Sequence, residues 1–272
     1  MSALSISRAW DETKARIAAD GKLIMVVAAA LVALPALVAG VVSPSSAEVE
    51  PTLTGAIVIL VASIIAIIGQ LAIIRLAIGP TVSVGEAIGH GARRMPVYFV
   101  AAILILIALF VAAIPFYAVL VATGVELDER AIVTSPLALL LGCLYLLVIC
   151  FFAIRMIMST PVASEESVGP IGILRRSWEL TRGHWWRLFG FLLLFVIAAV
   201  ILMMAIGWAV GFVAIILLGP VEPMSASALV IAIVEAIVNA AVTAVLAVML
   251  ARIYLQLSGH APAEATVPKS GT

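Results

Sequence analysis

Six long apolar stretches alternate with short polar segments along the chain. They cover approximately residues 23–42, 53–78, 96–121, 136–158, 188–217 and 226–255. Each is close to or longer than the roughly 20 residues that an α-helix needs to cross a bilayer core. Backbone groups in lipid must be hydrogen-bonded within their own segment, so helices are expected. The pattern therefore predicts an all-α integral membrane protein with six transmembrane helices.

The composition agrees with this interpretation. Of the 272 residues, 65% are hydrophobic and 11% are charged, whereas soluble domains carry about 25% charged residues. The formal net charge is zero, so no overall field attracts nucleic acid, and no nucleic-acid partner is expected. Residues 1–257 are predicted to form a single membrane domain, and residues 258–272 a flexible cytoplasmic tail.

The basic residues predict the orientation in the membrane. With these spans, fourteen of the fifteen Lys and Arg residues fall on one side, and Arg130 is the exception. Lys and Arg are enriched in the cytoplasmic segments of membrane proteins. Both termini are therefore expected in the cytoplasm.

The segments on this basic side resemble one another. Each contains a small residue followed by a bulky one and then a basic cluster, and the landmarks are Ala9-Trp10, Ala87-Ile88 and Ser177-Trp178. We expect three tandem repeats, at about 4–79, 80–160 and 161–257, each an interfacial amphipathic helix followed by a two-span hairpin. The alternative is a generic likeness, because every hairpin protein has basic cytoplasmic loops.

Apolar residues at helical spacing predict these short helices. Two of the stripes are Ile6, Ala9, Trp10, Thr13 and Ile17, and Ile171, Leu174, Trp178 and Trp185. A helix with Trp on its apolar face and basic residues beside it tends to lie in the membrane interface. The prediction of a helix is weaker for the middle segment, 84–95, because its three glycines lower helix propensity.

Arginines in these segments are candidates for binding anionic lipid headgroups. The candidates are Arg93, Arg94, Arg175, Arg176 and Arg182. Guanidinium groups can donate two hydrogen bonds to phosphate oxygens, and basic pockets on the cytoplasmic side suit such headgroups. The alternative is that these arginines only anchor the topology.

Two polar residues fall within the sixth span. Glu235 and Asn239 are one helical turn apart, and an ionisable residue inside a span is by default a functional hypothesis. The alternatives are a protonated Glu235 bonded to another helix, or a position near the outer interface. No metal-ligand spacing and no catalytic motif occurs, so neither a cofactor nor a metal site is expected.

Residues 177–190, together with Ala9-Trp10 and the three basic loops, resemble the glycerophosphoryl diester phosphodiesterase membrane-domain family. The resemblance covers nearly the whole chain and implies a bacterial inner-membrane protein of about six spans. In some members the membrane domain precedes a catalytic barrel. About 15 residues follow the sixth span here, so the barrel is expected to be absent and the protein is not expected to be an enzyme.

The leading functional hypothesis is a non-enzymatic membrane protein whose partners are membrane lipids, with a lipid-binding or membrane-organising role. A second hypothesis is a transporter or permease for a small or lipidic solute, motivated by Glu235, Asn239, Pro35 and Pro115. A third is an accessory subunit of another membrane protein.

Overall fold

The computed structural model describes residues 4–42, 53–79, 82–124, 135–220 and 225–259. Within these ranges the regular elements are helices, and six of them are long and apolar enough to cross a membrane. These candidate spans are Ile6–Gly40, Leu53–Ile78, Val84–Ala122, Pro136–Glu165, Trp185–Leu218 and Ala226–Ser258. The predicted all-α, six-span class is confirmed. Arg130 and residues 260–272, which make up most of the predicted tail, lie outside the described ranges.

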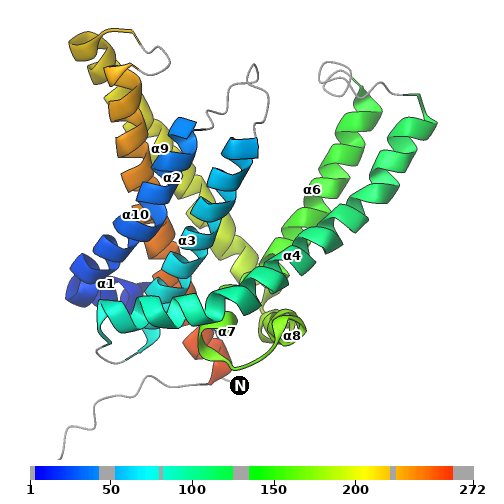
Figure 1. Ribbon diagram of the computed structural model, residues 1–272. Coiled ribbons are helices and arrows are strands. Elements are labelled where there is room, and N and C mark those ends of the chain that lie inside the picture. Colours follow the sequence, from blue (N-terminus) through cyan, green and yellow to red (C-terminus); the bar gives the residue numbers. More distant parts are fainter. Residues whose placement is uncertain (1–3, 43–52, 80–81, 125–134, 221–224, 260–272) are drawn as a thin grey trace, which may run out of the picture.

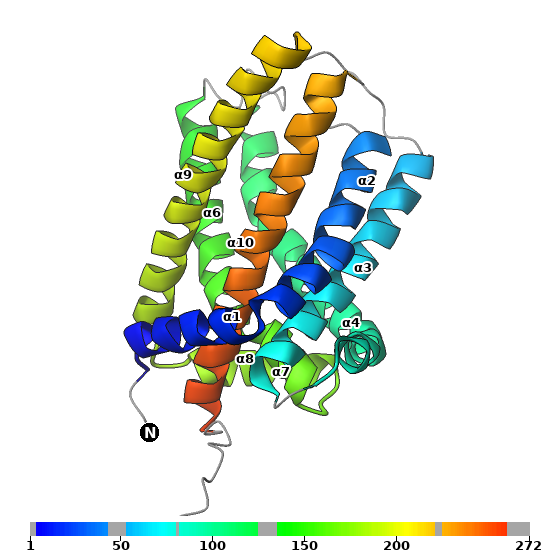
Figure 2. The ribbon, with the colours of Figure 1, turned by 90° about the vertical axis from the view of Figure 1, so that its left-hand side faces the viewer.

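The first span is one continuous, bent helical run. It consists of α1 (Ile6–Ala28), a π-helical turn η1 (Ala29–Ala33) and α2 (Leu34–Val42), and it is followed by α3 (Leu53–Ile78). Figure 2 shows the start of α1 crossing the base of the bundle and α2 rising beside α3. Pro35 has no N–H to donate and its ring crowds the preceding turn, and a wider π turn accommodates such a residue. The first predicted interfacial helix is therefore not separate from the span.

The second interfacial segment is also continuous with its span. Helix α4 (Val84–Ala122) has 39 residues, or about 58 Å at 1.5 Å per residue, nearly twice a bilayer core. Its first part crosses the base, and the rest rises beside α6 (Pro136–Met156) (Figure 1). Ser83 and Glu86 form a capping box at its start. That reciprocal pair satisfies two backbone N–H groups, which favours a helix despite the glycines.

The third interfacial segment is a separate helix. A short helix, α7 (Ser159–Glu165), which the sequence analysis did not predict, precedes α8 (Pro170–Thr181). Gly183 has φ 85°, a left-handed conformation that favours glycine and ends α8. Two long helices, α9 (Trp185–Leu218) and α10 (Ala226–Ser258), complete the described chain.

Helix α3 lies at the centre of the packed base. Its residues 71–74 are fully buried, and it contacts α1, α2, α4, α7 and α10. An added Cβ on Gly91 of α4 would lie 2.6 Å from the carbonyl oxygen of Ile68, so a glycine permits this close approach. Above the base, α4 and α6 diverge from α9 (Figure 1). Large apolar side chains there are exposed, such as Phe110 at 75% and Leu194 at 70%, as expected for a surface facing lipid.

Candidate functional site

The polar contacts at the base converge on α7. Five of its seven residues are buried: Ser159, Pro161, Val162, Ala163 and Ser164. The helix packs against α3, α4, α8 and α10, and it ends in the carboxylates Glu165 and Glu166. Carboxylates at a helix C-terminus face the negative end of the helix dipole. Their placement therefore calls for cationic partners, and arginines from α3 and α8 provide them.

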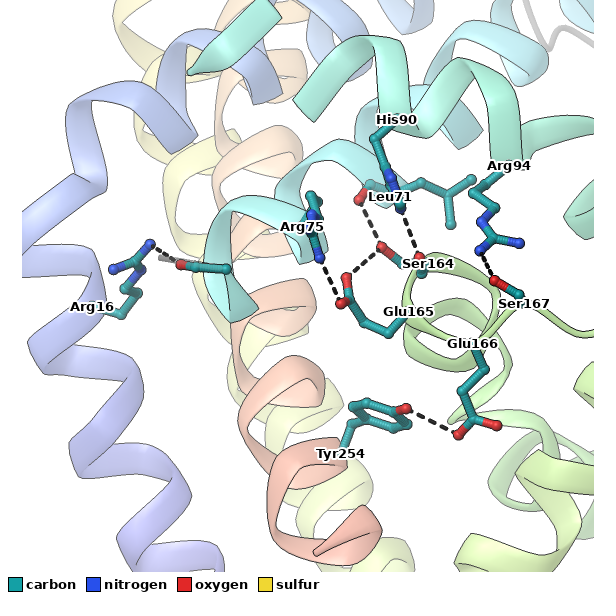
Figure 3. Close-up of polar contacts among 11 residues, drawn as sticks. Arg16, Leu71, Arg75, His90, Arg94, Ser164, Glu165, Glu166, Ser167 and Tyr254 are labelled. Atoms are coloured by element: carbon teal, nitrogen blue, oxygen red, sulfur yellow. Dashed lines mark hydrogen bonds and ion pairs between the residues drawn. The ribbon is translucent and has the colours of Figure 1, made fainter. Parts of the chain in front are cut away.

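The first carboxylate binds α3. Arg75 Nη1 donates to Glu165 Oε2 at 2.8 Å, and the two side chains are 33% and 15% exposed. Ser164 Oγ donates to the other carboxylate oxygen at 3.1 Å. His90 Nε2 of α4 lies 2.7 Å from the Ser164 carbonyl oxygen, so α3, α4 and α7 are connected by polar contacts (Figure 3).

The second carboxylate binds α8 and α10. Glu166 Oε1 accepts from Arg176 Nε at 3.0 Å and from the Tyr254 hydroxyl at 2.9 Å. The hydrogen bond to Glu166 raises the pKa of Arg176 above its ordinary value. Glu165 and Glu166 together join four helices of the base, and neither residue was singled out from the sequence.

Two further arginines bind the C-terminal end of α3. Arg16 of α1 donates to the carbonyl oxygens of Leu76 and, at 3.1 Å, of Gly79. Arg252 of α10 donates to the carbonyl oxygen of Ala77 at 2.9 Å. The last carbonyls of a helix have no partner within the helix and carry its negative dipole, so cationic donors stabilise them. These arginines therefore have a structural role.

Four of the five predicted headgroup arginines fall into two groups. Arg175 and Arg176 of α8 are ion-paired, with Glu179 at 3.0 Å and Glu166 at 3.0 Å. On α4, Arg93 donates to the carbonyl oxygen of Gly89, one turn earlier in the same helix. Arg94 donates to the hydroxyl of Ser167 at 2.7 Å.

Neither α4 arginine has a carboxylate partner among the described residues. Arg182, the residue after α8, is exposed. Among the described residues, the predicted headgroup arginines without a carboxylate partner therefore lie on α4 and at the end of α8.

The structure places the two intramembrane polar residues on an exposed face of α10. Glu235 and Asn239 are both exposed, and an added Cβ on Gly207 of α9 would lie 3.6 Å from Glu235 Oε1. Glu235 thus faces the α9 side of its helix. The transporter hypothesis that these residues motivated stays a prediction.

An aromatic cluster surrounds Arg155 where α6, α8 and α9 meet. The guanidinium carbon lies 4.7 Å from the centre of the Trp178 ring and 5.4 Å from that of Phe151. Trp185 stacks on Phe189 with 5.2 Å between ring centres. Trp186 is 76% exposed, which suits a side chain at the membrane surface. The cluster therefore holds a cationic group among aromatic rings at the end of α6.

The fold and these contacts define a six-span helical membrane protein with a polar base and an apolar surface. The chain belongs to the family described as a domain of unknown function, DUF7847, whose model matches residues 12–257. No curated protein and no solved structure matches the chain. The family match does not test the resemblance to the glycerophosphoryl diester phosphodiesterase membrane domain, which stays a prediction.

Proposed function

We propose that this protein is a non-enzymatic protein of the bacterial plasma membrane that binds the headgroups of anionic lipids at its basic end. The binding groups are Arg93 and Arg94 at the start of α4 and Arg182 after α8. The observation that carries the proposal is the arginine pair on α4, which has no carboxylate partner among the described residues.

The partners of the arginines decide which of them can bind a lipid. A guanidinium group has five N–H donors and binds phosphate best when these are free. Arg175 and Arg176 already donate to Glu179 and Glu166, so a lipid phosphate would have to compete with a carboxylate. Arg93 and Arg94 retain N–H groups for a ligand, because among the described residues each donates one hydrogen bond, to a neutral oxygen.

The position of these arginines supports the proposal. The starts of α1 and α4 cross the base of the bundle (Figures 1 and 2), and basic residues near the cytoplasmic surface attract anionic lipids. The bias of Lys and Arg to one side supports cytoplasmic termini, and the resemblance stated above supports a bacterial inner membrane. The three base segments each precede two spans, which supports the proposed threefold repeat.

The test compares two arginine pairs in the purified full-length protein. Arg93→Gln with Arg94→Gln removes the unpaired groups, and Arg175→Gln with Arg176→Gln removes the same charge from ion-paired positions. Binding of phosphatidylglycerol is measured by native mass spectrometry, with phosphatidylcholine as the uncharged comparison.

We expect the α4 variant to lose about tenfold or more in phosphatidylglycerol affinity, because charge-assisted hydrogen bonds contribute about 1.5–3 kcal/mol and about 1.4 kcal/mol is tenfold. The α8 variant should change by less than about threefold, as for exposed ion pairs. Equal losses in both variants would show that binding follows total charge and not these residues. Unchanged binding in both would reject the proposal.

A further inference from the structure

The side chain of Arg155 is partly buried, and two of its three nitrogens have no polar partner among the described residues. It lies in the last turn of α6, and its Nε and Nη1 atoms are buried without a hydrogen-bond partner among the described residues. Its contacts there are the faces of Trp178 and Phe151. A buried charge without a polar partner is costly, and native structures usually satisfy it. This arginine therefore calls for an anionic partner.

A second unsatisfied donor lies beside it. The indole nitrogen of Trp185, at the first position of α9, is buried without a partner, and so is Nδ1 of the preceding His184. The ring of Phe151 lies 6.2 Å from that of Trp185, so Arg155 and Trp185 pack against the same phenylalanine. Buried indole N–H groups normally find an acceptor. Since an indole nitrogen only donates, a ligand that satisfies both groups must offer acceptor oxygens.

The surroundings indicate an amphiphilic ligand. Helices α6 and α9 meet near this point and diverge above it (Figure 1). Further along each helix, apolar side chains are exposed, including Leu147 at 66% and Leu194 at 70%. Tryptophans at this level are typical of a membrane interface. A headgroup at Arg155 would therefore leave its acyl chains beside apolar surface.

We propose that the junction of α6, α8 and α9 binds the phosphate of one anionic glycerophospholipid, held by the Arg155 guanidinium and the Trp185 indole N–H, with the acyl chains between α6 and α9. The proposal deepens the lipid-binding function proposed above, because it assigns a second site to the same class of ligand. The site does not favour the cationic part of a lipid headgroup. Such a cation would bind the faces of Trp178 and Phe151, and Arg155 already occupies them.

Two variants each remove one donor from the full-length protein. Arg155→Met keeps an unbranched apolar side chain, and Trp185→Phe keeps an aromatic ring to stack on Phe189. Lys14→Gln is the control, because Lys14 is an exposed cation of α1 that pairs with Asp11. Affinity for phosphatidylglycerol is measured by native mass spectrometry in mild detergent, and the melting temperature is measured without added lipid.

Native mass spectrometry resolves successive binding steps, and we expect the affinity of one phosphatidylglycerol binding step to fall about tenfold in Arg155→Met and about threefold in Trp185→Phe, from the loss of a charged and a neutral hydrogen bond. The step assigned to the α4 arginines should be retained in both variants. The control should keep its affinity. The lipid-free melting temperature of Arg155→Met should be unchanged or higher, because an unpaired buried charge is removed. A lower melting temperature would assign Arg155 a structural role and overturn the proposal, as would unchanged affinity in either variant.

Two comparisons separate the remaining explanations. Inorganic phosphate that displaced phosphatidylglycerol at millimolar concentration would show a soluble-anion site and overturn the lipid assignment. Loss of binding in the Arg93→Gln, Arg94→Gln protein but not in Arg155→Met would reject this site and leave the proposed function intact. The reverse result would support this site and reject the α4 arginines as the binding groups.

Discussion

The ion pair between Arg75 and Glu165 gives a quantitative test of how the base is held together. Replacing Arg75 with Met leaves a carboxylate that is 15% exposed and has lost its cationic partner at 2.8 Å. Replacing Glu165 with Gln removes the charge but keeps an oxygen that can accept from Ser164. The single and double variants form a cycle that isolates the coupling between the two side chains.

The burial of the pair sets the expected magnitude. Exposed ion pairs contribute about 0–1 kcal/mol, whereas removing one partner of a buried pair costs about 3–5 kcal/mol. Arg75 and Glu165 are 33% and 15% exposed, so they lie between these limits. We expect a coupling free energy of about 2 kcal/mol, after allowance for screening by solvent at the more exposed arginine.

The chain contains a matched control pair. Arg175 and Glu179 form the same type of contact at 3.0 Å, but their side chains are 81% and 48% exposed. Their coupling should be about 0.5 kcal/mol or less. Both cycles are measured by unfolding the purified protein in mixed micelles with increasing sodium dodecyl sulfate. If the two pairs showed equal coupling, burial would not determine the strength of these contacts, and the central role assigned to α7 would be wrong.

The remaining predictions concern the packing and the hydrogen bonds of the same base. Gly91→Ala should lower the free energy of unfolding by about 1–3 kcal/mol, because its Cβ would lie 2.6 Å from the carbonyl oxygen of Ile68. Gly89→Ala on the same helix meets no atom within 4 Å and should be neutral or stabilising by up to about 1 kcal/mol. Tyr254→Phe should destabilise by about 1–2 kcal/mol through the lost bond to Glu166. Micelle unfolding checks all three, and a Gly91→Ala protein as stable as Gly89→Ala would contradict the close approach of α3 and α4.

The spans could be predicted because lipid imposes a requirement on each segment alone. A run of about 20 apolar residues satisfies it whatever the neighbouring helices are. The packing between helices could not be predicted in this way. Helix α7 reads as a polar linker of Ser, Thr, Pro and Glu, yet contacts from α3, α4, α8 and α10 bury it. Glu165 at the end of α7 pairs with Arg75, which is 90 residues away in the sequence. A single sequence carries no sign of that contact.

The interfacial stripes were only partly predictable, for a related reason. On α8 the predicted apolar stripe includes Ile171 and Trp178, and these are 74% and 36% exposed. The buried face contains Ile173, Ser177 and Leu180 instead. The sequence pattern separates apolar from polar positions, but it does not distinguish an apolar residue that faces lipid from one that faces another helix. The Ser177 hydroxyl can be buried at little cost because it donates a hydrogen bond to the carbonyl oxygen of Arg155 at 2.7 Å.

The same distinction applies to the charge bias of the chain. Arg16 and Arg252 donate to the end of α3, and Arg75 and Arg176 hold the carboxylates that follow or end α7. Basic residues on this side therefore hold helices together, whatever part they have in the predicted orientation of the protein. A variant that neutralises many arginines at once would unfold the protein as well as remove its lipid-binding groups, and the two effects could not be told apart. Arginines must be compared by their partners, and those that bind neither a carboxylate nor the end of another helix are the ones whose removal can report on lipid binding.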